Sequence, residues 1–458
     1  MSRPANIAVD NRPSPVRYQV LAVACCLALL TYLNRLGFGV AAAEIKHDLG
    51  FNDEQMGYLA SSFLLAYGLF QMPGGMLADR IGGRNLLTVL VTGWSLLSGA
   101  TAFGLWFHAG TGAAFVFLLV LRFAFGVLQA AEFPSLSRVM AEWMPVTERA
   151  SAMGTIWTFS RLGGAIVPFL FTGMLWLFGT WTTPFWVMAG LGLVWCAGFW
   201  PWFRDKPVDK RGVNRAELEF IAAGRSVESQ NPARLPIVDL LRSRNVWALS
   251  LMYGFVGFAG NFFTNMLPLY LRSQRHVSDW EFSCLSALPL AGGIVSCFVG
   301  GVLSDWIVRR WGSRKWGRRL SGAAGLSLAA LATLLVPWAG SLWALGFFLT
   351  AAFFGNDLNI APAWAACADV GEHNTGIVSG TMNMVGSFAG AAGTAFAGYF
   401  FKRDQAQLVF IVYSLSYCLA TLCWLAVDVS RPLVRSAPPV PLSEADPLMT
   451  ASCVEATR

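Results

Sequence analysis

The sequence is poor in charged residues and has little of the patterning of a soluble fold. Only 13% of its 458 residues are Asp, Glu, Lys or Arg, whereas 55% are hydrophobic and the mean hydropathy is +0.53. A soluble domain has about a quarter charged residues. The short alternating segments that build a transmembrane β-barrel are also lacking. We therefore expect an all-α membrane protein.

The cysteines and histidines do not have the spacing of a metal site or of a disulfide framework. Nine cysteines lie mainly in the hydrophobic runs, without a C-x-x-C pair, and the four histidines are far apart. No nucleophile–base pattern occurs either, so we expect no enzyme activity, no cofactor and no metal. The net charge of +7 forms no basic stripe with interleaved aromatics, which argues against nucleic-acid binding.

Hydrophobic stretches of about 20 residues recur along the chain, and each is long enough to cross a bilayer as a helix. About twelve are predicted, at 18–42, 56–78, 86–107, 113–140, 150–176, 182–203, 246–271, 282–304, 319–338, 342–366, 376–400 and 408–428. The predicted organisation is a segment 1–17, a six-helix half 18–203, a linker 204–245, a second half 246–428 and a proline-rich, disordered tail 429–458.

Basic residues predict the orientation. With the N-terminus inside, the linker and the loops around Arg80, Arg138 and Arg309 are cytoplasmic, as the positive-inside rule favours. The opposite loops are short or mixed in charge, and only a few basic residues there run against the trend. We therefore expect both termini in the cytoplasm. Within the linker, Asn214 and Glu217 resemble a capping box that opens an amphipathic surface helix.

A short charged motif occurs twice, 226 positions apart. The first copy runs from Gly75 to Asp79 and continues to Arg80 and Arg84, and the second runs from Gly301 to Asp305 and continues to Arg309. Its glycines permit close helix packing, and its aspartates can cap a helix or pair with arginines between the halves. We predict that Asp79, Arg80, Arg84, Asp305 and Arg309 control opening between the halves. Repeated halves are typical of transporters.

Three arginines lie inside predicted spans. Arg35, Arg122 and Arg161 are away from the span ends, where an arginine costs at least about 2.5–3.5 kcal/mol on insertion scales and usually marks function. The planar guanidinium suits a carboxylate, which favours an organic anion over a neutral sugar as substrate. The alternative is that one of them pairs with an intramembrane acid. Tyr32 and Tyr67 are expected to complete the site.

Several motifs together resemble the major facilitator superfamily, and within it the anion:cation symporter family of bacterial sugar-acid carriers (galactonate, hexuronate, glucarate) and animal vesicular glutamate and sialic-acid carriers. The resemblance covers residues 16–430. The motifs that carry it are Tyr32-Leu-Asn34-Arg35, Tyr67-x-x-x-Gln71-x-Pro73-Gly74-Gly75, Arg122-x-x-x-Gly126, Phe133-Pro134, Trp143-x-Pro145-x-x-Glu148-Arg149, Leu267-Pro268-x-Tyr270-Leu271, Trp364-Ala-x-x-x-Asp369-x-Gly371 and the stretch from Gly376 to Gly386.

The resemblance implies twelve transmembrane helices in two pseudo-symmetric halves that carry a small organic anion by alternating access. It implies that Arg35 and Arg122 bind the substrate carboxylate and that Tyr67, Trp364 and Asn383 contact the substrate. We expect a monomer in the lipid bilayer of a bacterial inner membrane, with the organic anion and protons as candidate partners.

The acids depart from the family pattern. Sugar-acid/proton symporters of this family have an aspartate before the helix-1 arginine and a glutamate seven residues after the helix-4 arginine, where this chain has Asn34 and Gln129. Amides do not carry a proton. Asp357 and Glu132 are the remaining candidates for proton coupling, each with a fixed arginine ion pair as the alternative. Proton symport, uniport and exchange all remain open.

Two other functions are weaker. A drug-efflux carrier usually has an acidic or apolar site for cations and a Gly-Pro motif in helix 5, which this chain matches only partly, up to Pro168. A transport-like sensor would need a longer linker or a signalling domain. An organic-anion carrier, and within this class a sugar-acid carrier, is the leading prediction.

Overall fold

The computed structural model describes residues 12–107, 112–223, 237–273, 275, 277–431 and 433, and within these residues it contains helices and no strand. The helices are α1 (Val16–Val40), α2 (Ala42–Leu49), α3 (Asp53–Ile81), α4 (Gly83–Thr101), α5 (Gly112–Ala130), α6 (Glu132–Trp143), α7 (Arg149–Phe178), α8 (Thr182–Trp202), α9 (Arg215–Ala222), α10 (Ile237–Arg242), α11 (Arg244–Asn261), α12 (Leu267–Ser273), α13 (Asp279–Trp311), α14 (Arg314–Leu335), α15 (Leu342–Leu358), α16 (Ile360–Gly371), α17 (Thr375–Phe401) and α18 (Ala406–Ala426). The predicted all-α fold is confirmed.

The described helices also account for the predicted crossings. Ten stretches are long and apolar enough to cross a membrane, and one of them, Leu342–Phe401, is 60 residues long. A short 3-10 helix at Glu372–Asn374 divides that stretch into two crossings. The first is formed by α15 and α16, and the second by α17. The more polar α3, 29 residues long, adds a further crossing. Together they give the twelve predicted spans.

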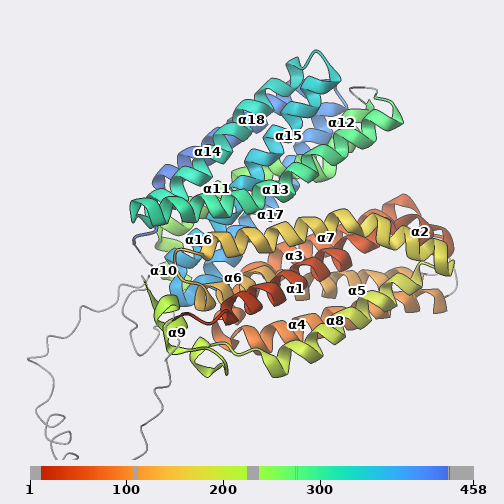
Figure 1. The fold of residues 1–458 in the computed structure, drawn as a ribbon. Helices are drawn as coiled ribbons and strands as arrows, with labels where there is room; N and C mark the ends of the chain where they lie inside the picture. The colour runs from red at the N-terminus through yellow and green to blue at the C-terminus, as the bar shows by residue number, and fades with distance from the viewer. Residues whose placement is uncertain are drawn as a thin grey trace, which may run out of the picture.

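Two bundles form from the two parts of the chain (Figure 1). In the first, α1 packs on α7, α3 on α5 and α4 on α8. In the second, α11 packs on α17, α13 on α15 and α14 on α18. Each bundle contacts the other through equivalent helices, because α3 packs on α17 and α13 packs on α7. The interface therefore repeats the internal duplication of the sequence.

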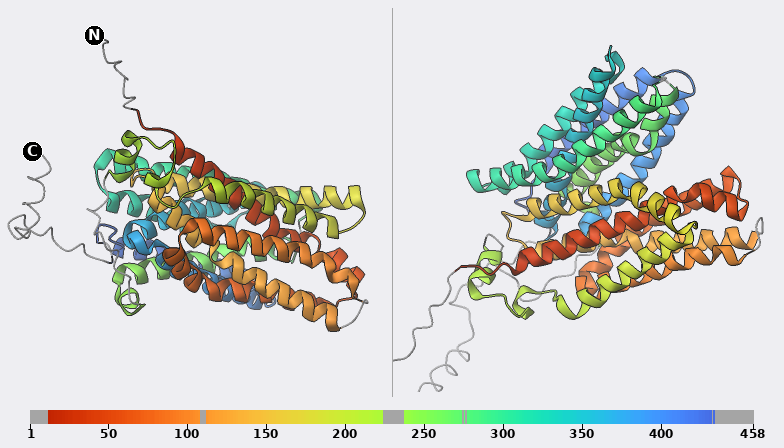
Figure 2. Two further views of the ribbon diagram at one scale, coloured as in Figure 1. Left: turned by 90° about the horizontal axis from the view of Figure 1, so that it is seen from below. Right: turned by 45° about the vertical axis from the view of Figure 1, so that its right-hand side comes forward.

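The bundles meet at one end and separate at the other (Figures 1 and 2). They converge where α9, α10 and residues 427–433 lie, which we call the terminal face, and diverge toward α2 and α12, which we call the opposite face. A Cβ at Gly68 on α3 would lie 3.4 Å from the ring of Phe388 on α17, so the two helices run close together near the middle of both. The structure is therefore closed at the terminal face.

Apolar side chains cover much of the outside of the bundle. Trp176, Trp343 and Phe169 are 87%, 89% and 81% exposed. Large exposed apolar side chains are costly in water and suit contact with lipid tails. Inside, Trp94, Trp364 and Trp424 are fully buried. The pattern fits an integral, multi-pass membrane protein.

The linker helix α9 is docked and not free on the surface. Asn214 caps it by accepting a hydrogen bond from the Glu217 amide at 2.9 Å. The predicted reciprocal bond of a capping box is replaced, because the Glu217 carboxylate accepts bonds from the Ser14 hydroxyl and from the Arg17 amide at 3.0 Å instead. The linker is thus tied to the start of α1. Residues 224–236 of the linker, 1–11, and the tail from 434 lie outside the described residues, as does the prediction of a disordered tail.

Candidate functional site

Arg35 is held by an amide and surrounded by aromatic rings. Its Nε donates to the Gln129 side-chain oxygen at 2.9 Å. Its guanidinium carbon lies 4.4 Å from the ring centre of Tyr67 and 5.1 Å from that of Tyr32. The faces of these rings stabilise the cation electrostatically. The predicted association of Tyr32, Arg35 and Tyr67 is therefore present in the structure.

Arg122 lies beside Arg35 in a similar aromatic setting. Its guanidinium carbon is 4.3 Å from the ring centre of Phe38 and 4.8 Å from that of Phe63. Arg35 approaches the same Phe63 ring at 5.9 Å. Arg122 is only 8% exposed. Two like charges thus share one apolar surrounding, which is costly unless an anion joins them.

Several buried polar atoms of these arginines, of Gln129 and of Asn34, the residue before Arg35, lack a hydrogen-bond partner among the described residues. A buried polar group without a partner costs about 1–3 kcal/mol, and in a native site it calls for an explanation such as an absent ligand. They lie on two arginines and two amides and belong to one half of the protein. The atoms are Arg35 Nη2, Arg122 Nε, Gln129 Nε2 and Asn34 Oδ1.

Arg161 is occupied by an acid from the other half. Its Nε and Nη2 donate to the two carboxylate oxygens of Asp357 at 2.8 and 2.9 Å. Asp357 is fully buried and also accepts a bond from the Asn356 amide at 2.9 Å. The structure thus realises the alternative of an arginine–acid pair for Arg161, and it pairs the two residues that we predicted as substrate ligand and coupling acid. The bidentate pair links α7 to α15.

Glu132 is a buried acid without a basic partner. It is fully buried at the start of α6, and no Arg, Lys or His of the described chain lies within 4 Å of its carboxylate. One oxygen contacts the Thr31 hydroxyl, and the other has no partner. The same hydroxyl lies 2.9 Å from the Leu27 carbonyl. A hydroxyl has one proton, so both Thr31 bonds are complete only when Glu132 itself carries a proton.

The C-terminal half contributes Trp364 and Asn383. The Trp364 indole donates to the Tyr253 hydroxyl at 3.2 Å, and its ring lies 5.7 Å from that of Trp157 in the other half. Asn383 donates to the Tyr67 hydroxyl at 3.4 Å. Trp364 is fully buried and Asn383 is 8% exposed. Both predicted residues therefore lie between the halves, next to the aromatic residues that surround Arg35.

Two further buried amides, Asn359 and Asn356, serve the packing of their own half. The Asn359 oxygen accepts from the Trp424 indole at 2.6 Å. The Asn356 oxygen accepts from the Tyr417 hydroxyl at 3.0 Å. Interhelical hydrogen bonding is a common role for Asn in membrane bundles. These side chains are thus structural.

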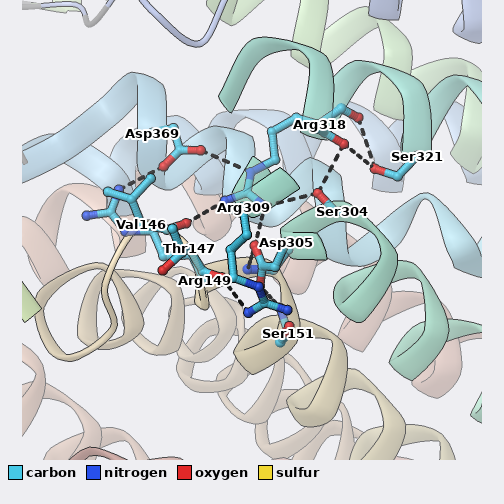
Figure 3. A network of polar contacts seen from close by, with 12 residues as sticks. Val146, Thr147, Arg149, Ser151, Ser304, Asp305, Arg309, Arg318, Ser321 and Asp369 are labelled. Atoms are coloured by element: carbon cyan, nitrogen blue, oxygen red, sulfur yellow. Dashed lines mark hydrogen bonds and ion pairs between the residues drawn. The ribbon is translucent and has the colours of Figure 1, made fainter. Parts of the chain in front are cut away.

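The aspartates of the duplicated motif each cap a helix of the other half. Asp79 accepts hydrogen bonds from the amides of Gly376 and Ile377, both at 2.8 Å. Asp305 accepts from the amides of Ala150 at 3.4 Å and Ser151 at 2.6 Å. Figure 3 shows the second copy. A carboxylate at a helix N-terminus is favoured by the helix dipole. Both caps join the halves at the terminal face.

Each glycine of the duplicated motif lets its helix touch a helix of the other half beside the aspartate cap. A Cβ at Gly75 would collide with the carbonyl of Gly376, and one at Gly301 would collide with the carbonyl of Ala150. These collisions would occur directly beside the aspartate caps. The spacing between Gly75 and Asp79 therefore couples a close helix crossing to a charged cap.

A buried ion network next to the Asp305 cap was not identified from the sequence (Figure 3). Arg318 is fully buried and lies 2.6 Å from Asp305 and 3.1 Å from Asp369. Arg149 of the other half lies 2.8 Å from Asp369. Arg318 also donates to the carbonyl of Val146 at 2.9 Å. In the sequence Arg318 is one of several neighbouring basic residues, and only the motif with Asp369 indicates a partner for it.

The basic residues of the motifs differ in position. Arg309 donates to the Thr147 carbonyl of the other half at 3.4 Å (Figure 3). Arg84 instead donates to the Trp200 carbonyl at 2.8 Å within its own half. Arg80 is exposed. The structure thus brings Arg309 to the junction between the halves, whereas Arg84 contacts its own half.

Comparisons with known proteins agree with this architecture. The profile of the Major Facilitator Superfamily matches residues 24–394. A probable sulfoacetate transporter of Cupriavidus necator is 30% identical over 399 residues, covering 84% of this chain and 88% of that protein. A probable galactarate/D-glucarate transporter of Escherichia coli is 29% identical over 404 residues (86% and 88%), and a hexuronate transporter of Bacillus subtilis is 30% identical over 423 residues (89% and 93%).

Solved structures share the fold at low sequence identity. A proton:xylose symporter superposes with a TM-score of 0.69 at 13% identity, covering 90% of this chain and 96% of that one. A human organic anion transporter superposes with a TM-score of 0.67 at 18% identity, covering 90% and 100%. At these identities the likeness concerns the fold.

Proposed function

Because the chain belongs to the major facilitator superfamily, and so is a membrane transporter and not an enzyme, we propose that it carries a small organic anion across the membrane by alternating access. The observation that carries this proposal is the neighbouring pair of Arg35, partly buried, and Arg122, buried, because Arg35 Nη2 and Arg122 Nε have no hydrogen-bond partner in the described chain. Charge-assisted bonds to an acid group would complete both. Relatives named for sulfoacetate, galactarate, glucarate and hexuronate support an organic acid, with a sugar acid as the leading class.

Alternating access would use the contacts at the terminal face as a gate. The caps at Asp79 and Asp305 and the Arg318–Asp369–Arg149 network all join the halves there. The bundles diverge at the opposite face (Figure 1). These bonds would break when the terminal face opens and reform when it closes. The basic residues of the linker and of the loops at the terminal face support a cytoplasmic location of this face, by the positive-inside rule.

Coupling to protons would pass through Glu132. Its unpaired oxygen and the doubly engaged Thr31 hydroxyl fit an acid that takes up and releases a proton. Asp357, the other acid predicted as a coupling candidate, is bound bidentately to Arg161 and would instead hold the two halves together. Exchange or uniport is the second candidate, favoured by the amides Asn34 and Gln129 at the family's acid positions.

Transport by the purified full chain in proteoliposomes tests the function. A panel of labelled sugar acids and short organic acids would be offered with and without a pH gradient. Arg35→Ala and Arg122→Ala should each nearly abolish uptake while inserting normally, and Arg215→Ala, on the exposed surface of α9, should not. Wild-type apparent affinity in both site variants would refute the anion site. Accumulation that ignores the pH gradient would favour exchange or uniport.

A further inference from the structure

Four arginines inside the protein, the buried Arg122 and Arg318 and the partly buried Arg35 and Arg161, fall into two groups according to how their charges are balanced. Arg161 is paired with Asp357, and Arg318 with Asp305 and Asp369, at distances of 2.6–3.1 Å. A buried charge is stable in an apolar medium only when it is paired. These ion pairs are therefore complete without a ligand.

Arg35 and Arg122 form the second group. Neither guanidinium has a carboxylate within 4 Å in the described part of the chain. Glu132 interacts electrostatically with Arg35 from a distance. Its carboxylate is bonded to Thr31 and makes no ion pair. The residue that does contact Arg35 is Gln129, a neutral amide. Its hydrogen bond orients the guanidinium without cancelling the charge.

Two uncancelled positive charges thus lie near one aromatic ring, that of Phe63. A single acid group would balance one of them and leave the other buried and unpaired, at a large cost. We propose that the substrate is a dianion, a short organic molecule with two acid groups, one bound by Arg35 and the other by Arg122. This inference rests on the proposed function and specifies the charge of the anion.

The free donors support two separate contacts. Arg35 has Nη2 unpartnered and Arg122 has Nε unpartnered, so each guanidinium can offer an N–H group to its own acid group. The second unpartnered donor beside Arg35, Gln129 Nε2, can bond an oxygen of the same group. Arg122 is less than one-tenth exposed, so its charge is not screened by water. Carboxylate, sulfonate and phosphonate groups share the chemistry required.

Binding to the purified full chain tests the dianion directly, with thermal stabilisation titrated against concentration. Two matched pairs differ by one charge: glucarate against gluconate, and succinate against monomethyl succinate. A second charge-assisted contact predicts about 10- to 100-fold tighter binding of the diacid in the pair that fits the site. Equal affinity within both pairs would overturn the dianion while leaving the anion carrier intact. If no anion bound at all, the anion carrier and the dianion would both be rejected.

Adding one negative charge to the site gives the sharper test. Gln129→Glu places a carboxylate next to Arg35 with almost no change in side-chain size. The ratio of diacid affinity to monoacid affinity should therefore fall toward one, because the monoacid should gain affinity. Arg122→Gln should also remove the preference, since a single arginine remains. Arg215→Gln on exposed α9 is the matched control and should keep it. Binding of a monoacid by Gln129→Glu would show that this variant is folded.

An inorganic anion could occupy the second arginine instead. Titrations with chloride replaced by a bulky anion address this possibility. A monoacid whose affinity equals that of the diacid only when chloride is present would overturn the proposal. A diacid preference that is unchanged by chloride and lost in Gln129→Glu is the expected result.

Discussion

Replacing Asp79 with asparagine should loosen the terminal face. Asp79 accepts two backbone hydrogen bonds of 2.8 Å from the first turn of α17, and Arg138 lies 3.7 Å from the same carboxylate. Asparagine keeps the shape, but it removes the charge and turns an N–H group toward one of the two donors. The aspartate side chain is only 9% exposed, so water can replace little of what is lost.

The size of the effect follows from these bonds. Hydrogen bonds to a charged group contribute about 1.5–3 kcal/mol, and we expect the variant to lose about that much from the closed state. At 1.4 kcal/mol per tenfold change, the population open at the terminal face should rise about 10- to 100-fold. Turnover should fall, because reclosing is less favourable. Binding of the anion should persist, since Asp79 makes no contact with Arg35 or Arg122.

Hydrogen exchange followed by mass spectrometry measures this opening. The amides of Gly376 and Ile377 should exchange about 10- to 100-fold faster in Asp79→Asn, because they lose the acceptor that protects them in the closed state. Asp53→Asn is the matched control, because this carboxylate is 93% exposed. Unchanged exchange in the first turn of α17, or complete loss of anion binding, would refute the reasoning.

Three further changes test other contacts. Arg161→Ala should destabilise the protein by about 3–5 kcal/mol because it leaves Asp357 buried and unpaired, and adding Asp357→Ala should restore part of the melting temperature; an additive loss would argue against the pair. Gly75→Ala should push α3 away from Gly376 and accelerate amide hydrogen exchange at the start of α17. Normal protection of these amides would show that the helices can accommodate the added methyl group. Glu132→Gln should abolish pH-driven accumulation of substrate and spare counterflow exchange, whereas intact accumulation would remove Glu132 from coupling.

The periodicity of the sequence was sufficient for the fold. Hydrophobic runs of crossing length must become helices in a bilayer because the backbone finds no other hydrogen-bond partner there. The predicted spans agree with the observed helices within a few residues at most ends, for example 150–176 with Arg149–Phe178. The duplicated motif also predicted contact between the halves. Local patterns decide these features, so they can be read along the chain.

Tertiary structure decided which charges meet. Arg35, Arg122 and Arg161 look alike in sequence, as arginines within apolar runs, yet of the three only Arg161, on α7, is brought to an acid, Asp357 on α15. Likewise Arg318 is one of a cluster of basic residues and becomes fully buried between two aspartates. A pairing depends on residues far apart along the chain, and the cost of a buried charge depends on its partner. The sequence determined where the charges are placed, and only the packed helices determine which are balanced.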